Sequence, residues 1–250
     1  MGKLGLDERK DREPVQPMNA DEVSLFLATC KKYRNDWYPF FLCAFRTGRR
    51  LGELLALHWG DIDWKSKYIQ VQRAFRNGRI TKTKTSRSRR VDMSDQLCDE
   101  LKDLYKRRKE EGLKAGKGAP EEIVFHTKGA YTSQNTTRNI WKRMLDKAKL
   151  RDMRFHDIRN SFASLLLSNG ESPVYVKEQL GHSSIQMTVD IYGHLIPSSN
   201  RQAVNALDEN APKRTPSAPA KNEEAVIPQD HSLLSSVVAM QGLEPRTLRI

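Results

Sequence analysis

Residues 65–90 carry ten Lys or Arg residues and no Asp or Glu, which constrains both the fold and the surroundings of this stretch. The segment YIQVQR at 68–73 alternates apolar and polar residues, and Asn77-Gly78 is a hairpin-turn signal. The stretch therefore predicts an antiparallel ribbon of two or three short strands with a basic exposed face. So many like charges favour a polyanion lying alongside, and the alternative interpretation is a solvated basic hairpin.

Helical periodicity flanks this ribbon on both sides. Asn19 and Glu22 have the spacing of a capping box, ahead of an apolar face that runs to Cys30. Further helical patterns follow at 37–45, 51–55, 94–112, 133–149, 156–168, 173–180 and 184–192, while EEIVFH at 121–126 is typical of a short strand or loop. The chain is therefore predicted to adopt an α+β fold that is mainly α-helical, with a small antiparallel β-sheet.

The composition changes near the C-terminal end. Residues 197–250 hold six Lys or Arg and six Asp or Glu, so the net charge of +12 comes from the first 196 residues. Six of the eleven prolines also lie in this last part. We predict a polar linker at 1–17, a folded domain at 18–207 and a disordered tail at 208–250.

Three cysteines and the hydropathy pattern indicate the compartment. Cys30, Cys43 and Cys98 form an odd set without metal-ligand spacing, so they are interpreted as reduced packing residues. No apolar run is long enough to span a membrane, and the N-terminal residues lack the hydrophobic core of a signal peptide. We therefore expect a cytoplasmic protein with no membrane partner.

Two motifs in the second half of the sequence suggest chemistry on a phosphodiester. His156 and Arg159 form an H-x-x-R pair at the start of a predicted helix, where residues i and i+3 share a face. Tyr192 follows His182 by ten residues in LGHSSIQMTVDIYGHL. A phenol with a pKa of about 10 is a weak nucleophile at neutral pH, so nearby cations or a base must help remove its proton.

Four segments in order between Thr47 and Leu195 extend this pattern: TGRRLGELLALHWGDID, KTKTSRSRRVDM, HDIRNSFASLLLSNG and LGHSSIQMTVDIYGHL. Together they resemble the motif blocks of the tyrosine recombinases, the phage-type integrases. The resemblance implies the catalytic-domain fold of that family for residues 18–207. It makes Tyr192 the nucleophile and Glu53 a supporting acidic residue, with a phosphate-activating set of Arg50, Lys84, His156, Arg159 and His182.

The residue types suit these implied roles. Guanidinium forks match phosphate oxygens, which assigns Arg50 and Arg159 to the scissile phosphate; the structural alternative for Arg50 is a buried pair with Glu53. His182 is expected to donate a hydrogen bond to that phosphate, and His156 to act as a base or to position the phenol. Lys84 is the expected acid for the leaving 5′ oxygen, and Lys82 is the alternative.

The same resemblance implies the partners and the reaction. The expected function is a site-specific recombinase or integrase of a phage or mobile element, which cleaves and rejoins DNA strands through a covalent 3′-phosphotyrosyl intermediate. The partner is double-stranded DNA at specific recombination sites, bound by a homo-oligomer that is a tetramer on DNA, with accessory proteins as further partners. Arg87, Arg89 and Arg90 are predicted to contact DNA phosphates. No cofactor or metal is expected, because no closely spaced ligand set is present.

One departure from the family leaves alternatives open. Only about 18 residues precede the first predicted helix, so the core-binding domain that normally comes before the catalytic domain is expected to be absent. The first alternative is a truncated, catalytically silent DNA-binding regulator that occupies recombination sites. The second is a type IB-like DNA topoisomerase, which cuts and religates one strand by the same chemistry. Trp59 is interpreted as a core residue rather than a DNA contact.

Overall fold

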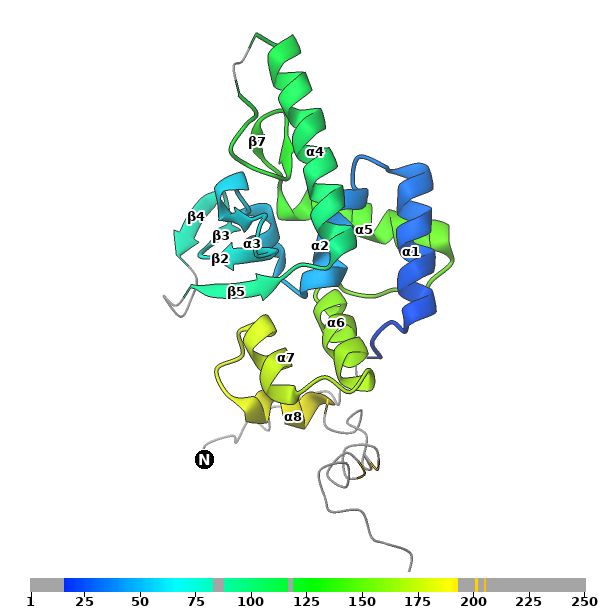
Figure 1. Cartoon of the computed structure of the whole chain (residues 1–250). Coiled ribbons are helices and arrows are strands. Elements are labelled where there is room, and N and C mark those ends of the chain that lie inside the picture. The colour runs from blue at the N-terminus through cyan, green and yellow to red at the C-terminus, as the bar shows by residue number, and fades with distance from the viewer. Residues whose placement is uncertain (1–15, 83–87, 117–118, 193–200, 202–204, 206–250) are drawn as a thin grey trace, which may run out of the picture. The chain divides into compact units, whose positions relative to one another are not determined.

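The computed structural model describes residues 16–82, 88–116, 119–192, 201 and 205 (Figure 1). The chain divides into two units, Met1–Ser199 and Asn200–Ile250, and the description below concerns the first. The predicted linker lies outside the described residues apart from 16 and 17. The predicted tail at 208–250 lies wholly outside them, so both boundaries stay predictions.

Four helices form the larger core: α1 (Ala20–Tyr33), α2 (Tyr38–Thr47), α4 (Asp95–Lys114) and α5 (Gln134–Ala148). The predicted capping box begins α1, since the Asn19 side chain accepts a hydrogen bond from the Glu22 amide and the Glu22 carboxylate accepts one from the Asn19 amide. Nearly every residue of α2 is buried, as its continuous apolar sequence requires. Phe26 of α1 packs on Trp141 of α5, with the ring centroids 4.6 Å apart.

The strands form three small antiparallel sheets. One has the order β1-β2-β5, from β1 (Ile62–Asp63), β2 (Tyr68–Val71) and β5 (Arg89–Asp92). The others are the hairpins of β3 (Arg73–Arg76) with β4 (Arg79–Lys82), and of β6 (His126–Thr127) with β7 (Ala130–Tyr131). Asn77 and Gly78 both have positive φ, at 47° and 74°, as the predicted tight turn demands. The basic stretch thus contributes to two sheets, because β2 pairs with β5 while β3 and β4 pair separately.

The remaining elements lie around the junction of these parts. They are α3 (Leu51–Leu55), the 3₁₀ turn η1 (Trp59–Asp61), α6 (Asp157–Ser168), α7 (Pro173–Leu180) and α8 (Ile185–Tyr192). In Figure 1, α7 and α8 are seen below the strands, and α6 runs between them and the larger core. A second apolar cluster holds α6, α7 and α8 together through Phe162, Leu167, Val176, Leu180 and Tyr192.

Several local predictions are confirmed in the described residues. The three cysteines are free and buried, and Trp59 is buried against Tyr105, with the ring centroids 5.0 Å apart. Gly170 follows the end of α6, and Gly181 in the left-handed conformation ends α7. The mainly helical α+β class with small antiparallel sheets is also confirmed. No helix in the described part of the chain is both long and apolar enough to cross a membrane.

Candidate active site

Arg159 is fixed between the C-terminal ends of two helices. Its Nη1 donates to the carbonyl oxygen of Gly48, just after α2, at 2.9 Å, and its Nη2 donates to the carbonyl of Leu180, the last residue of α7. Helix C-termini carry partial negative charge, which favours a cation there. Burial nevertheless lowers the pKa of Arg159 to about 9, with the charges of Arg50 and Arg89 adding to the effect. The guanidinium is thus a buried cation held by two carbonyl groups, and a nearby anion would offset the unfavourable effect of burial and of the neighbouring arginines.

Gly48 explains how the chain brings Arg159 and α2 so close together. Its φ of 56° places it in the left-handed region, where it caps α2. A Cβ atom at this position would lie 2.5 Å from the Phe162 ring, and Phe162 is three residues beyond Arg159 on α6. Glycine is therefore required both for the turn and for the close packing of α6 against it.

Glu53 joins two arginines from different elements. Its Oε1 accepts from Arg50 Nη1 at 3.0 Å, and its two carboxylate oxygens accept from Arg89 Nη1 and Nη2 at 3.2 and 2.7 Å. Burial alone would raise the pKa of this carboxyl group, but the hydrogen bonds and charge of Arg89, followed by the charges of Arg49 and Arg50, lower it to about 2. Glu53 is therefore a buried carboxylate that orients cations from α3 and β5.

Arg49 and Arg50 are neighbours in sequence with opposite environments. The Arg50 side chain is 39% exposed, whereas Arg49 is buried and donates through Nη2 to the Glu53 carbonyl oxygen at 2.7 Å. Among the described residues, Nε and Nη1 of Arg49 have no hydrogen-bond partner. Burial is the main cause of the lowered pKa of Arg49. The exposed guanidinium of Arg50 is thus the one available to a ligand, and the buried one adds positive potential beneath it.

The two predicted histidines flank the arginines. His156 directly precedes α6 and is exposed. Its pKa is lowered by partial desolvation and then by the positive charge of Arg159. His182 follows Gly181, and its Nδ1 lies 2.9 Å from the hydroxyl of Thr188 on α8. Burial and then Arg159 lower the pKa of His182 to about 4. Both imidazoles are therefore neutral near pH 7, where each has one N–H to donate.

Tyr192 is buried and lies near Arg159. Only 4% of the residue is exposed, and its hydroxyl donates to Oδ1 of Asn160, on α6, at 2.5 Å. Burial raises the pKa of Tyr192 to about 12, although the charge of Arg159 acts in the opposite direction. The phenol is thus protonated and shielded in this conformation.

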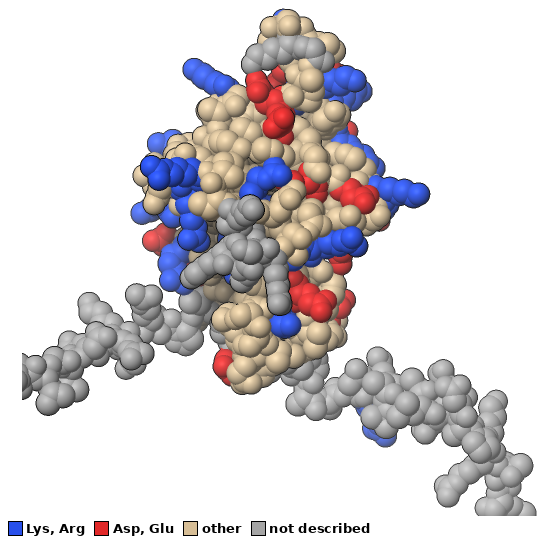
Figure 2. Space-filling model, turned by 90° about the vertical axis from the view of Figure 1, so that its left-hand side faces the viewer, with Lys and Arg blue, Asp and Glu red and all other residues tan. Residues whose placement is uncertain are grey.

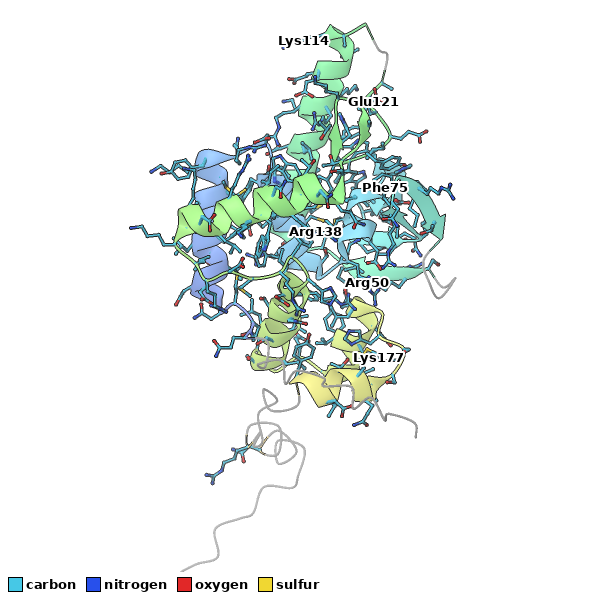
Figure 3. The ribbon with its side chains drawn as sticks, turned by 180° about the vertical axis from the view of Figure 1, so that it is seen from behind. Arg50, Phe75, Lys114, Glu121, Arg138 and Lys177 are labelled. Carbon is cyan, nitrogen blue, oxygen red and sulfur yellow. The ribbon has the colours of Figure 1, made fainter. Side chains whose placement is uncertain are left out.

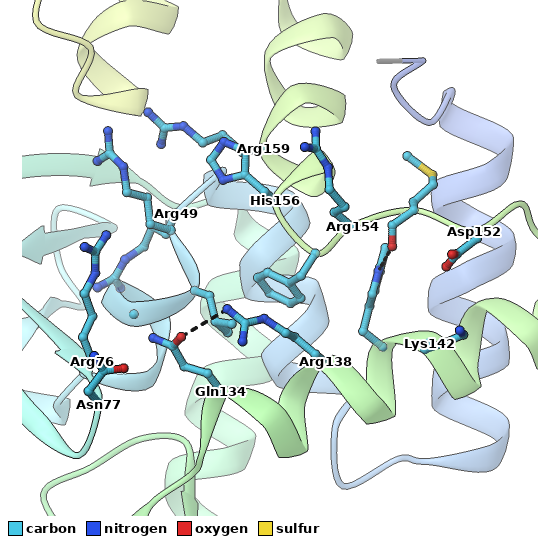
Figure 4. Close-up of a pocket in the computed structure, with 16 residues that line it drawn as sticks. Arg49, Arg76, Asn77, Gln134, Arg138, Lys142, Asp152, Arg154, His156 and Arg159 are labelled. Atoms are coloured by element: carbon cyan, nitrogen blue, oxygen red, sulfur yellow. Dashed lines mark hydrogen bonds between the residues drawn. The ribbon is translucent and has the colours of Figure 1, made fainter. Parts of the chain in front are cut away.

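A cavity of about 790 Å³ opens beside the arginines (Figure 4). Arg50, His156 and Arg159 line one part of it, while β3 and α5 contribute further basic side chains; His182 and Tyr192 are outside the lining. The lining Lys and Arg residues are Arg49, Arg50, Arg76, Arg138, Lys142, Arg154 and Arg159, and the acidic residue among the lining side chains is Asp152. Seen from behind, Arg138 on α5 and Arg50 lie on the same side of the molecule (Figure 3). On the face shown in Figure 2, Lys and Arg side chains occur at many separate places.

The structure brings together most of the residues that the sequence singled out. The group formed by Arg50, Glu53, Arg159, His182 and Tyr192 comes from α3, α6, α8 and the turn after α7. Lys84 and Arg87 lie outside the described residues, and Lys82 ends β4, so the choice of the general acid stays open. Among the described residues, no group of three or more His, Cys, Asp or Glu side chains is arranged to hold a metal ion.

Arg89, for which a contact with a DNA phosphate stays a prediction, is mostly buried and hydrogen-bonded within the protein. Its side chain is 15% exposed, and its Nε donates to the Gln179 carbonyl oxygen at 3.1 Å in addition to the two bonds with Glu53. The reason is the close approach of α7, where a Cβ on Gly181 would lie 2.8 Å from the Arg89 side chain. Arg90, the next residue, is exposed and lies over the Tyr68 ring at 4.7 Å.

Three residues of this site were not identified from the sequence: Arg49, Asn160 and Thr188. Arg49 stands beside Arg50 in TGRR, and Asn160 directly follows Arg159. Polar residues inside otherwise apolar helical patterns were the available signal for Asn160 and Thr188. Their partners lie 32 and 6 residues away, so no local spacing reveals them.

Solved structures share this fold. The Tn1549 transposon integrase, solved in complex with circular intermediate DNA, matches with a TM-score of 0.65 and 23% sequence identity, over 79% of this chain and 68% of that one. The catalytic domain of bacteriophage HP1 integrase matches with a TM-score of 0.55 and 23% identity, over 80% of this chain and 99% of that domain. The chain therefore shares the fold of these two integrase structures.

The sequence comparisons identify the family. The profile of the phage integrase family matches residues 16–198. A XerC-like tyrosine recombinase from Caldanaerobacter subterraneus subsp. tengcongensis is 32% identical over 82% of this chain, and the ICEBs1 integrase of Bacillus subtilis is 30% identical over 79%. The matches cover 57% and 55% of those relatives, so the chain spans little more than half their length. The chain belongs to the phage integrase family, as its four motif blocks predict.

Proposed function

We propose that this chain is a site-specific DNA recombinase that cleaves and rejoins strands through a 3′-phosphotyrosyl intermediate on Tyr192. The observation that carries the proposal is that Arg159 lies near Arg50, His182 and the Tyr192 phenol, so that its charge acts on the pKa of both His182 and Tyr192. These residues come from three separate parts of the sequence. Family membership and the matched recombinase structures support the same reaction.

The arginines bind the scissile phosphate in this proposal. Arg159 is preorganised by two helix ends, and Arg50 by Glu53, so little reorganisation is needed when charge develops on the phosphate oxygens. If Nδ1 of the neutral His182 accepts the Thr188 hydroxyl proton, its Nε2–H remains to donate to the same phosphate. Glu53 acts through the arginines and does not touch the substrate.

Cleavage and rejoining of the strand take place in two transesterification steps. The Tyr192 oxygen attacks the phosphorus and forms a P–O bond, while the bond from phosphorus to the 5′ oxygen breaks. The phenolic proton passes to a base, for which His156 is proposed, and the leaving 5′ oxygen takes a proton from Lys84 or Lys82. A second 5′-hydroxyl then attacks the phosphotyrosine and releases the phenol, so the number of phosphodiester bonds is conserved and no ATP is consumed.

The basic cavity supplies the surface for duplex DNA. Its seven Lys and Arg residues extend from the arginines of the site to β3 and α5, and phosphate contacts of this kind give affinity without sequence information. Arg90, on β5, and Arg87, which precedes that strand, are proposed to make further contacts with DNA phosphates. We further propose residues 18–207 as the catalytic domain, acting as a homo-oligomer, a tetramer on DNA, with accessory proteins.

The buried phenol favours the second candidate, a silent regulator that occupies recombination sites without cutting them. A residue that is 4% exposed cannot reach a phosphate held in an adjoining cavity without rearrangement. The two candidates differ in one product, the covalent protein–DNA adduct.

A suicide substrate tests the proposal. The chain is incubated with duplex attachment-site DNA nicked near the cleavage position, and adducts that resist SDS are separated by electrophoresis. The wild type should accumulate an adduct that Tyr192→Phe does not form, while both bind DNA equally. An adduct of equal yield with Tyr192→Phe, or the absence of any adduct despite specific DNA binding, would contradict the proposal; the second result would favour the regulator.

A further inference from the structure

The hydrogen bond between Tyr192 and Asn160 has a fixed direction, which follows from a third residue. Nδ2 of Asn160 faces Oδ1 of Asp157 at 3.3 Å, and Oδ1 of Asn160 faces the phenol at 2.5 Å. An ionised carboxylate only accepts hydrogen bonds, so the amide nitrogen must face Asp157. The amide oxygen is therefore left for Tyr192, and the phenol must be the donor.

Asp157 is itself held in place, so the amide cannot readily turn over. Its Oδ2 accepts from the Arg154 amide at 2.9 Å, and its Oδ1 accepts from Arg154 Nη2 at 2.8 Å. Asp157 is buried at the start of α6, while the Arg154 side chain is 60% exposed and lines the basic cavity. If the Asn160 amide were reversed, two oxygens would face each other and the amide would lose its bond to Asp157.

This direction matters for the chemistry. An amide oxygen accepts a hydrogen bond but is far too weak a base to take the proton itself. The bond therefore stabilises the neutral phenol and opposes formation of the phenolate, in the same sense as the burial that raises the pKa of Tyr192 to about 12. The apolar neighbours Phe162 and Leu180 add to the shielding.

We infer that Asn160, oriented by Asp157, is a positioning residue that holds the Tyr192 phenol in a protonated resting position, and that strand cleavage requires this hydrogen bond to break. The inference rests on the proposed function, since it concerns the nucleophile of that reaction. It adds a step before attack, in which α8 moves the phenol out of the apolar cluster towards the bound phosphate.

The elements around Tyr192 are consistent with such a movement. α8 exposes Ile185, Met187 and Val189, at 42%, 43% and 37%, so much of its apolar side is not buried in the described structure. α6, in contrast, is anchored by Arg159 at two helix ends. The bond between Tyr192 and Asn160 therefore joins a well-fixed helix to one with fewer buried side chains.

The first test needs no DNA and uses the full chain. Tetranitromethane nitrates exposed, ionisable phenols, and mass spectrometry of peptides reports each tyrosine separately. Tyr33, which is 50% exposed, is the internal reference. Tyr192 should react at least about tenfold more slowly than Tyr33 in the wild type, and Asn160→Ala should raise its rate about fivefold, the factor expected for losing one net hydrogen bond.

Asn169→Ala is the matched control, because Asn169 ends the same helix and its side chain is exposed. It should leave the nitration of Tyr192 unchanged. If Asn160→Ala does not fold, Asn160→Ser replaces it, since a serine hydroxyl at that position is too short to reach the phenol. Nitration of wild-type Tyr192 as fast as Tyr33, or no change in either Asn160 variant, overturns the inference.

The second test measures the initial rate of adduct formation on the nicked substrate. Asn160→Ala should form the adduct about fivefold faster than the wild type. A slower rate would mean that Asn160 assists attack, and it would overturn the inference. If no variant forms an adduct while nitration behaves as expected, the proposed recombination fails and the resting position of Tyr192 stands, so the two failures are distinguishable.

Discussion

The proposed phosphate-binding part of the site and the helix that carries the phenol are stabilised in different ways. Arg159 is bonded to the ends of α2 and α7, and Glu53 joins α3 to β5 through Arg50 and Arg89. Tyr192 is joined to α6 through Asn160, and α8 leaves several apolar side chains exposed. The cations proposed to bind the phosphate are thus held in place by several hydrogen bonds, whereas the proposed nucleophile is buried and held by one. This difference predicts that substitutions in the first part cost stability, and those around α8 mainly alter reactivity.

Replacing Glu53 should cause the largest loss of stability in the proposed phosphate-binding part. Glu53→Gln keeps the shape of the side chain but leaves Arg49 and Arg89 without a counter-charge in a buried position, which should cost about 3 kcal/mol of unfolding free energy. Urea denaturation of the full chain at pH 7 measures this loss. A difference below about 0.5 kcal/mol would show that the carboxylate does not organise the arginines, since surface substitutions have effects of that size.

The pH dependence of the Glu53 variant provides its control. The folded pKa of about 2 is below the ordinary 4.5, so the carboxylate stabilises the fold fully above pH 4.5, and this contribution is lost as the pH falls towards 2. The stability difference between the wild type and Glu53→Gln should therefore shrink between pH 4.5 and pH 2. A difference that stays constant over this range would assign the loss to packing instead of charge.

Gly48→Ala should have the next largest effect. The added methyl group meets the Phe162 ring at 2.5 Å in a left-handed backbone conformation, so α6 must move away from α2. We expect a loss of about 2 kcal/mol in unfolding free energy, from strain and overpacking together. Gly60→Ala is the matched control, because no atom lies within 4 Å of a Cβ there. Equal stability losses in the two variants would contradict the role assigned to the turn.

The sequence predicted the local structure of the site better than the burial and the hydrogen-bond partners of its side chains. Helix patterns, the capping box and the Asn77-Gly78 turn are local, so they were predicted correctly. The motif blocks singled out Arg50, Arg159 and Tyr192, whose catalytic roles stay predictions. The burial of Arg49 was not predictable, because adjacent arginines look alike until the backbone turns one of them inwards. Arg89 points inwards because α7 packs against β5. The hydrogen bond from Tyr192 to Asn160 depends on how α8 packs against α6. Both are long-range contacts that no local pattern contains.

Thr188→Val should have the smallest effect, and it tests the α8 side of the comparison. Valine fills the same volume but cannot form a hydrogen bond with His182 Nδ1, so the imidazole loses the contact that we propose orients it for phosphate binding. Because the rest of the cation group is unchanged, we expect the unfolding free energy to fall by no more than about 1 kcal/mol, and the adduct rate by about three- to tenfold.

The pKa of His182 is about 4, so the ratio of the wild-type and Thr188→Val adduct rates should stay constant from pH 6 to pH 8. A ratio that changes over this range would show that His182 titrates there and is not the neutral donor proposed. A stability loss as large as that of Gly48→Ala would instead show that α8 is as firmly anchored as the phosphate-binding part.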